Sequence, residues 1–322
     1  MSVELRAVAE DEADIRLDRW FRRHFPDLTQ GVIQRLCRTG QIRVDGKRVE
    51  AATRLAPGQS VRIPPLPASP APQAAPPAAD GRVRAEVERM VLWQDDHLIV
   101  LNKPAGLPTQ GGPGIARHLD GMLAALATGA GGKPRLVHRL DRDTSGVLVV
   151  ARTPGVAAKL AAAFRTRAVE KTYWAVVVGR PVPVEGRIDL PLVRHDPGPG
   201  GARVAAAERG EAEAARAVTD YRTLDHAGRK LAWLELAPLT GRTHQLRVHC
   251  AAIGAPILGD AAYGAAPVEG LSLLLHLHAR RLVLPHPAGG TLAVEADLPP
   301  HMAATFRALG FTAPAARPGQ RK

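Results

Sequence analysis

The stretch of this 322-residue sequence with the most reactive side chains is residues 136–150, LVHRLDRDTSGVLVV. Apolar residues at both ends predict two buried strands, and a polar loop from His138 to Ser145 joins them. A loop held between buried strands is a common place for a scaffold to display reactive groups. Asp141 could act there as a carboxylate nucleophile or base, kept ionised by arginine. The alternative is a structural aspartate that only pairs with Arg139 or Arg142.

Other reaction classes fit the sequence poorly. Ser145 is not in a G-x-S-x-G elbow, which argues against a serine hydrolase. The segment HQLRVH lacks the glutamate of H-E-x-x-H, and the pair His276 and His278 has no third ligand at a fixed spacing. The Gly-rich run 129–133 is followed by Pro134, where a phosphate-binding loop needs Ser or Thr. We therefore expect neither a metal nor a nucleotide cofactor.

The charge pattern indicates a polyanionic partner. The chain carries 43 Lys and Arg against 31 Asp and Glu, a net charge of +12. Residues 16–62 alone hold eleven basic and four acidic residues, so over half of the excess lies in about a seventh of the chain. Such a concentration favours a nucleic acid, although an arginine-rich solvated surface typical of a GC-rich genome is the alternative.

The same composition excludes other classes of protein. No apolar run approaches the roughly 20 residues that span a bilayer, and the first residues do not form a signal peptide. We therefore predict no membrane association. Only two cysteines occur, which fits a reducing cytoplasm and no disulfide framework.

A Pro- and Ala-rich stretch divides the chain. Residues 64–79 read PPLPASPAPQAAPPAA, which predicts an extended spacer because proline blocks both helix and sheet. We expect a small domain over 14–63, a linker over 64–87, a large domain over 88–311 and a disordered basic tail over 312–322.

Local patterns define the small domain. Helical spacing of apolar residues predicts helices around 17–21 and 32–37, the second capped by Thr29 and ended by Gly40. Residues 42–49 predict a hairpin that turns at Asp45-Gly46, and residues 61–63 a short strand. This order of elements resembles the S4 RNA-binding domain. The resemblance implies RNA as the polyanion and a basic helical face that includes Arg19, Arg35 and Arg38.

The large domain carries several motifs in an order that resembles one enzyme family. HRLDRDTSG (138–146) is similar to the H-R-L-D-x-x-T-S-G signature of the pseudouridine synthases that modify ribosomal and transfer RNA. Four further segments agree with that family: VLNKPAG, KTYWAVVVG, LTGRTHQLRVH and GAPILGDAAYG. The resemblance implies an α+β fold with a mixed, largely antiparallel central sheet flanked by helices. It also implies a cofactor-free isomerisation of uridine in RNA after base flipping.

The resemblance further assigns residue roles. Asp141 matches the catalytic aspartate, as a nucleophile toward C1′ or as a base that opens a glycal route. Arg247 matches the arginine that pairs with this carboxylate, and Tyr173 the aromatic that stacks on the target base and is a candidate relay for the C5 proton. Arg139 is placed to contact RNA and fill the space left by the flipped base.

Second-line candidates for RNA contacts are Arg242, His244 and Gln245. Alternation along a predicted strand over 242–249 puts Gln245 and Arg247 on one face, with Arg242 acting from the strand entrance.

The substrate and assembly follow from the same resemblance. An S4 domain in front of this signature implies large-subunit (23S) rRNA or its assembly intermediates as the partner, and we expect a cytoplasmic monomer. The rival hypothesis is a non-catalytic rRNA-binding assembly factor with the same fold. Intact Asp141, Tyr173 and Arg247 argue against it, because a binding module gains nothing from a buried charge pair that costs desolvation.

Overall fold

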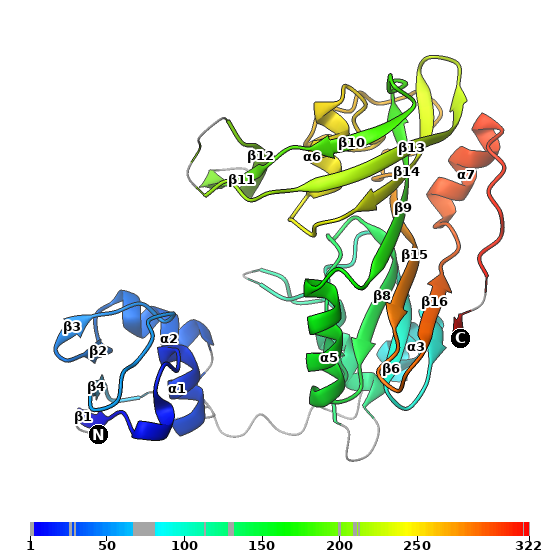
Figure 1. Cartoon of the computed structure of the whole chain (residues 1–322). Helices are drawn as coiled ribbons and strands as arrows, with labels where there is room; N and C mark the ends of the chain where they lie inside the picture. The colour runs from blue at the N-terminus through cyan, green and yellow to red at the C-terminus, as the bar shows by residue number, and fades with distance from the viewer. Residues whose placement is uncertain are drawn as a thin grey trace. The chain divides into compact units, whose positions relative to one another are not determined.

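The computed structural model describes residues 3–25, 28, 30–66, 81–112, 114–127, 132–198, 201–208, 211, 213–317 and 319–321. The chain forms two compact units, Met1–Pro77 and Ala78–Lys322 (Figure 1). The expected helix cap Thr29 and the middle of the expected linker, residues 67–80, lie outside the described residues.

The smaller unit packs two helices against a four-stranded sheet. Helices α1 (Leu17–His24) and α2 (Gln30–Arg38) bury the apolar residues whose spacing predicted them, among them Trp20, Phe21 and Ile33. The sheet has the order β1 (Glu4–Ala7), β4 (Ser60–Ile63), β2 (Arg43–Val44) and β3 (Lys47–Arg48), and all pairs are antiparallel. The predicted turn is confirmed, because Asp45 and Gly46 have the positive φ angles, 50° and 76°, of a tight two-residue hairpin.

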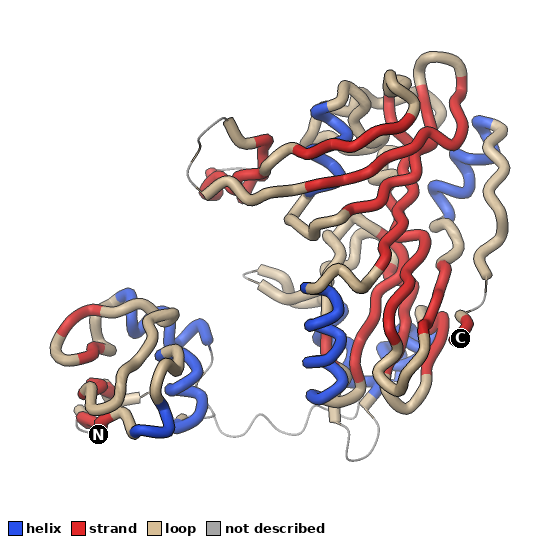
Figure 2. The backbone as a smooth tube through the Cα atoms, in the orientation of Figure 1, coloured by secondary structure: helices blue, strands red, loops and turns tan. Residues whose placement is uncertain are grey.

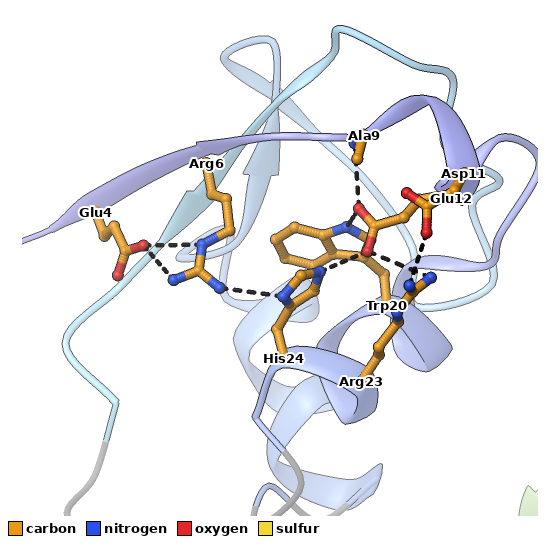
Figure 3. Close-up of polar contacts among 8 residues, drawn as sticks. All are labelled: Glu4, Arg6, Ala9, Asp11, Glu12, Trp20, Arg23 and His24. Carbon is orange, nitrogen blue, oxygen red and sulfur yellow. Dashed lines mark hydrogen bonds and ion pairs between the residues drawn. The ribbon is translucent and has the colours of Figure 1, made fainter.

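A buried carboxylate fastens the start of the chain to α1 (Figure 3). Glu12, in the short 3-10 helix η1 (Glu10–Glu12), accepts hydrogen bonds from Trp20 Nε1 at 2.7 Å and from the Ala9 backbone N–H at 3.2 Å. His24 Nε2 lies 2.6 Å from the same carboxylate. Burial alone would raise the pKa of Glu12, but these hydrogen bonds lower it below its ordinary value. The carboxylate therefore stays charged in a dry position.

The larger unit is built on one long mixed sheet (Figure 2). Its main strands have the order β10 (Glu185–Asp189), β13 (Val218–Ala227), β14 (Leu231–Pro238), β9 (Glu170–Val178), β15 (Leu277–Pro285), β8 (Ser145–Ala151), β6 (Leu98–Lys103) and β5 (Val91–Gln94). β16 (Thr291–Glu295) pairs with β15, β17 (Gln320–Arg321) with β16, and β7 (Arg135–Leu136) with β8. Among the described strands only β15 and β8 run parallel, so the predicted largely antiparallel sheet is confirmed.

The parallel contact between β8 and β15 is short. It joins Ser145 to His278 and Gly146 to Ala279, after which the two strands separate. At this crossing only glycine fits, because a Cβ on Gly146 would lie 2.2 Å from the Ala279 carbonyl oxygen and the residue has φ +111°. The residues before β8 lie along the part of the β8 edge that β15 does not pair with.

Helices cover both faces of the sheet (Figure 1). Ile99, Leu101, Leu148 and Val150 of β6 and β8 face α3 (Gly81–Arg89), α4 (Leu119–Met122) and the 3-10 helix η2 (Leu123–Leu126). The alternate residues of these strands face α5 (Pro154–Arg165). At the other end, α6 (Gln245–Ala252) and α7 (Pro300–Leu309) pack on opposite faces of β9 and β14. None of the described helices is long and apolar enough to cross a membrane.

Three expectations about this unit differ from the structure. Residues 81–87, expected in the linker, belong to α3, whose Val87 is buried in the core. The tail expected to be disordered packs on the body where it is described: Pro314 accepts a hydrogen bond from Arg280 at 2.8 Å. Residues 245–252 form a helix in place of the expected strand. β11 (Leu192–Gly198) and β12 (Gly201–Ala206) pair antiparallel as a separate two-stranded sheet.

Candidate active site

A cleft of about 1120 Å³ opens in the larger unit beside the separating strands. Its lining comes from the loop before β8, the end of α5, the start of β9 and the segment that leads into α6. Every site residue predicted for the large domain contributes to it: Arg139, Asp141, Tyr173, Arg242, His244, Gln245 and Arg247. The structure therefore brings these seven residues to one cleft, although the contacts inside it differ from those expected.

The loop that carries Asp141 is fixed on both sides of that residue. The Lys103 ammonium, fully buried at the end of β6, donates to the carbonyl of Arg142 at 2.9 Å. Thr109 Oγ1 bonds the backbone of Leu140 in both directions, accepting from its N–H at 3.3 Å and donating to its carbonyl at 2.5 Å. Because both neighbours of Asp141 are held by buried side chains, its carboxylate is presented on a rigid backbone.

His138 fills the gap that β15 leaves on β8. Its Nε2 accepts from the backbone N–H of Val149 at 2.9 Å, a group that a neighbouring strand would otherwise satisfy, and its ring stacks on Phe164. Burial and, to a smaller extent, the positive charge of Lys171 together lower the pKa of His138 to about 3. His138 is therefore neutral and structural, and it does not act as a base for Ser145.

Tyr173 lies on β9 and lines the cleft with Asp141. Burial raises the pKa of Tyr173, and the charge of Asp141 raises it further. The hydroxyl therefore stays protonated at neutral pH, so the ring offers an uncharged aromatic face and a hydrogen-bond donor.

Arg247 forms an ion pair with a partner that the sequence analysis did not assign. Its Nε and Nη2 each lie 2.7 Å from the carboxylate of Asp260, which is 1% exposed. Burial works to lower the pKa of Arg247, but the hydrogen bonds and charge of Asp260 keep it above its ordinary value, and Asp141 adds a smaller attraction. The expected direct pair with Asp141 is not formed in this structure, where Asp260 is the ion-pair partner of Arg247.

The Gln245 side chain has a structural role. Its Oε1 accepts from Thr240 Oγ1 and the Arg242 backbone N–H, and its Nε2 donates to the Val218 carbonyl and Thr219 Oγ1. With its amide fully used and 3% exposed, it has no hydrogen-bonding capacity left for RNA. It fastens the start of α6 to β13 instead.

Two of the other predicted cleft residues, Arg139 and Arg242, face solvent. Arg139 is exposed and has no ion pair with any described residue. Arg242 is also exposed, and its Nε donates to the Arg216 carbonyl at 3.2 Å. His244 precedes α6 in a left-handed conformation, with φ 53°. These positions agree with contacts to a ligand that enters the cleft from outside.

In the smaller unit, Arg19, Arg35 and Arg38 are all exposed. None of the three forms an ion pair within the described part of the chain. Other arginines of this unit are paired: Arg6 with Glu4, Arg16 with Asp18, Arg23 with Asp11 and Arg54 with Asp14. Some of this pairing is visible in Figure 3. Arg19, Arg35 and Arg38 therefore keep their positive charge uncompensated by any described acidic residue.

The histidines considered as metal ligands are hydrogen-bonded within the core. His276 contacts the Leu274 carbonyl at 2.7 Å and Thr305 Oγ1 at 2.8 Å, and His278 contacts Ser145 Oγ at 2.9 Å. Within the described ranges no group of His, Cys, Asp or Glu could hold a metal ion.

Comparison with known proteins agrees with this architecture. Residues 97–252 match the family model described as RNA pseudouridylate synthase, and residues 15–61 match that of the S4 domain. The chain is 36% identical to "Ribosomal large subunit pseudouridine synthase C" of Rickettsia bellii, over 88% of this chain and 94% of the relative. For the protein of that name from Vibrio cholerae the values are 33%, 93% and 95%.

A solved structure supports the same assignment. "Human RNA Pseudouridylate Synthase Domain Containing 4" superposes with a TM-score of 0.61 at 32% identity, covering 73% of this chain and 98% of that one. The agreement of sequence, fold and cleft composition places this chain in the family of RNA pseudouridine synthases.

Proposed function

We propose that this synthase converts uridine to pseudouridine in large-subunit rRNA and that Asp141 is its catalytic carboxylate. The observation that carries the proposal is the convergence of Asp141, Tyr173 and Arg247 on one cleft large enough for a nucleotide. The named activity of the relatives from Rickettsia and Vibrio supports the choice of RNA.

In the proposed reaction the target uridine leaves its stack and enters the cleft, where Tyr173 packs on the base and Arg139 occupies the vacated space. The N1–C1′ bond breaks, the uracil turns, and a C5–C1′ bond forms. The proton lost from C5 balances the proton gained at N1, so no cofactor is consumed. Asp141 assists bond cleavage either as the nucleophile at C1′ or as the base for a glycal intermediate.

Arg247 acts on this chemistry through its charge. Held in place by Asp260, the guanidinium contributes a fixed positive charge to the cleft that Asp141 also lines. The protonated Tyr173 can donate a hydrogen bond to an oxygen of the flipped nucleotide.

The smaller unit is proposed to bind rRNA through Arg19, Arg35 and Arg38. Their exposure and lack of acidic partners among the described residues leave their charge available to phosphates. We also propose that the protein acts as a monomer in the cytoplasm. Its two cysteines, Cys37 and Cys250, are both buried free thiols, as expected in a reducing compartment.

The test is pseudouridine mapping by carbodiimide labelling and primer extension on large-subunit rRNA. Free rRNA and assembly intermediates would each be incubated with the wild type, Asp141→Asn and Asp143→Asn. Asp143 is the matched control, because it lies two residues away in an exposed ion pair with Arg142. We expect a stop with the wild type and Asp143→Asn, and a loss of activity of about a thousandfold or more with Asp141→Asn.

A stop that persists with Asp141→Asn would overturn the role of Asp141. Small-subunit rRNA serves as the specificity control in the same assay. Stops confined to that RNA would show that the proposed substrate is wrong while the activity is right.

A further inference from the structure

The loop behind α6 contacts two side chains at the cleft. Besides Asp260, which pairs with Arg247, this loop carries Tyr263. The Tyr263 hydroxyl lies 2.8 Å from His244 Nδ1, and its ring lies 4.8 Å from the Arg247 guanidinium carbon. Both His244 and Arg247 line the cleft, whereas Tyr263 does not. Tyr263 is therefore placed to act on the site only through these two residues.

The direction of the hydrogen bond to His244 follows from the other neighbours of the hydroxyl. Val204 on β12 makes a backbone hydrogen bond to Tyr263, and a backbone N–H can only donate. The Tyr263 oxygen accepts that bond, so its own proton is free to go to His244 Nδ1. If Nδ1 donated instead, the hydroxyl proton would have no acceptor among the described residues.

This direction sets the chemistry of the opposite ring nitrogen. Burial lowers the pKa of His244, and the charges of Asp141 and Asp260 oppose the effect without cancelling it, while Arg247 and Arg139 add to it. The ring is therefore neutral at neutral pH and carries one proton, which must sit on Nε2 when Nδ1 accepts. Nε2 has no partner among the described residues.

We propose that Tyr263 is a positioning residue that fixes His244 as its Nε2–H tautomer, so that the ring donates a hydrogen bond to an acceptor oxygen of the target nucleotide. This inference rests on the proposed function only for the identity of the ligand that accepts the hydrogen bond from His244. A carbonyl of the flipped uracil and a phosphate oxygen are the two acceptors that share this chemistry. The tautomer itself is a property of the free protein.

The tautomer can be measured without turnover. In the full-length chain with ¹⁵N-labelled histidine, two-dimensional NMR distinguishes protonated from unprotonated ring nitrogens, and His244→Gln identifies which of the 12 histidines is His244. We expect an unprotonated Nδ1 and a protonated Nε2 in the wild type. In Tyr263→Phe, which keeps the ring beneath Arg247 but removes the hydroxyl, we expect a mixture of the two tautomers.

Tyr221→Phe is the matched control. It removes a hydroxyl that is also bonded to one acceptor, the Pro183 carbonyl at 3.0 Å, and Tyr221 does not line the cleft. We expect wild-type His244 signals in this variant. An Nδ1–H tautomer in the wild type, or an unchanged tautomer in Tyr263→Phe, would overturn the proposal.

Activity tests the second half of the proposal. With folding checked by thermal unfolding, Tyr263→Phe should lower kcat/KM about tenfold, the loss expected for one hydrogen bond, and Tyr221→Phe should not. A shifted tautomer with unchanged kcat/KM would refute the donor role. A wild-type protein that makes no pseudouridine but shows the expected tautomer would instead count against the proposed function alone.

To identify the acceptor, the same variants would be assayed on RNA with 2,4-dithiouridine at the target, which replaces both uracil carbonyl oxygens, and on RNA with a methylphosphonate flanking it. A Tyr263→Phe defect that disappears only with the first substrate indicates the uracil carbonyl, and one that disappears only with the second indicates the phosphate. A defect undiminished on both substrates would contradict a donor to either oxygen.

Discussion

The three arginines proposed to bind RNA in the smaller unit and Arg247 at the cleft of the larger unit are held in opposite ways. In the smaller unit, Arg19, Arg35 and Arg38 stand in solvent without ionic partners in the described chain. In the larger unit, the Arg247 side chain is 12% exposed and is bonded bidentately to a fully buried carboxylate. Exposed cations cost little to maintain and act through the field that they create together. A buried pair costs desolvation and fixes one geometry. The first arrangement suits the capture of RNA and the second suits chemistry on one nucleotide.

The largest expected difference between the units is their response to acid. Burial lowers the pKa of His138 to about 3, and of His276 and His278 to about 4, all three in the larger unit. Between these values and about 6.5 the unfolded chain binds more protons than the folded chain, so stability falls as the pH falls through this window. The full effect is about 3 kcal/mol each for His276 and His278 and about 5 kcal/mol for His138.

Hydrogen exchange of the full-length chain from pH 7 to 4 would measure this effect in each unit separately. The smaller unit depends instead on the charged Glu12, whose stabilising effect is lost only below its ordinary range near 4.5. Amides of β8 and β15 should therefore lose protection at a higher pH than those of α1. Simultaneous loss in both units would contradict the prediction.

The buried ion pair gives the next largest effect. Asp260→Asn leaves the Arg247 charge without its counter-ion, so we expect a loss of about 3–5 kcal/mol in urea unfolding, together with a loss of activity. Asp220→Asn is the control, because Asp220 pairs with Arg187 on the surface, where the two side chains are 39% and 60% exposed. That change should cost less than about 1 kcal/mol. Equal losses of unfolding free energy in the two variants would contradict the distinction between the buried ion pair of Arg247 and the exposed ion pair of Arg187.

The exposed arginines give the smallest change in stability and a specific change in binding. Replacing Arg19, Arg35 and Arg38 together by Ala should make the slope of log K against log salt for RNA binding shallower by about 2–3. Unfolding should change little. The control replaces Arg6, Arg23 and Arg54, which are paired with acidic residues. An equal change of slope in the control would show that arginines paired with acidic residues contribute as much to RNA binding as the unpaired ones.

The success of sequence analysis depended on how local each signal was. The hairpin turn at Asp45-Gly46 was predictable, because two adjacent residues specify it. Helix α6 was not, because Gln245, Leu246, Val248, His249 and Cys250 are all buried. A short helix that is covered on most sides has no polar face, so it lacks the helical periodicity of apolar residues. The sequence T-H-Q-L-R-V-H alternates instead in the way expected of a strand.

The partners of the site residues were less predictable than the residues themselves. Asp141 and Tyr173 were identified from motifs that are contiguous in sequence. Asp260 was present in a matched motif, but its pairing with Arg247 depends on how the loop folds behind α6. Lys103 was likewise in a matched segment, yet only the packing of β6 beneath the Asp141 loop shows that its ammonium holds the Arg142 carbonyl. Such tertiary approaches leave no periodic signal in one sequence.

The short parallel ladder between β8 and β15 limits how this protein could be stabilised. Two paired positions hold the strands together, and the loop with Asp141 uses the edge that lies beyond them. Substitutions that extended the pairing would add backbone hydrogen bonds and displace His138 and its loop from that edge. A variant selected only for resistance to heat could therefore gain stability by closing the space in which uridine must turn.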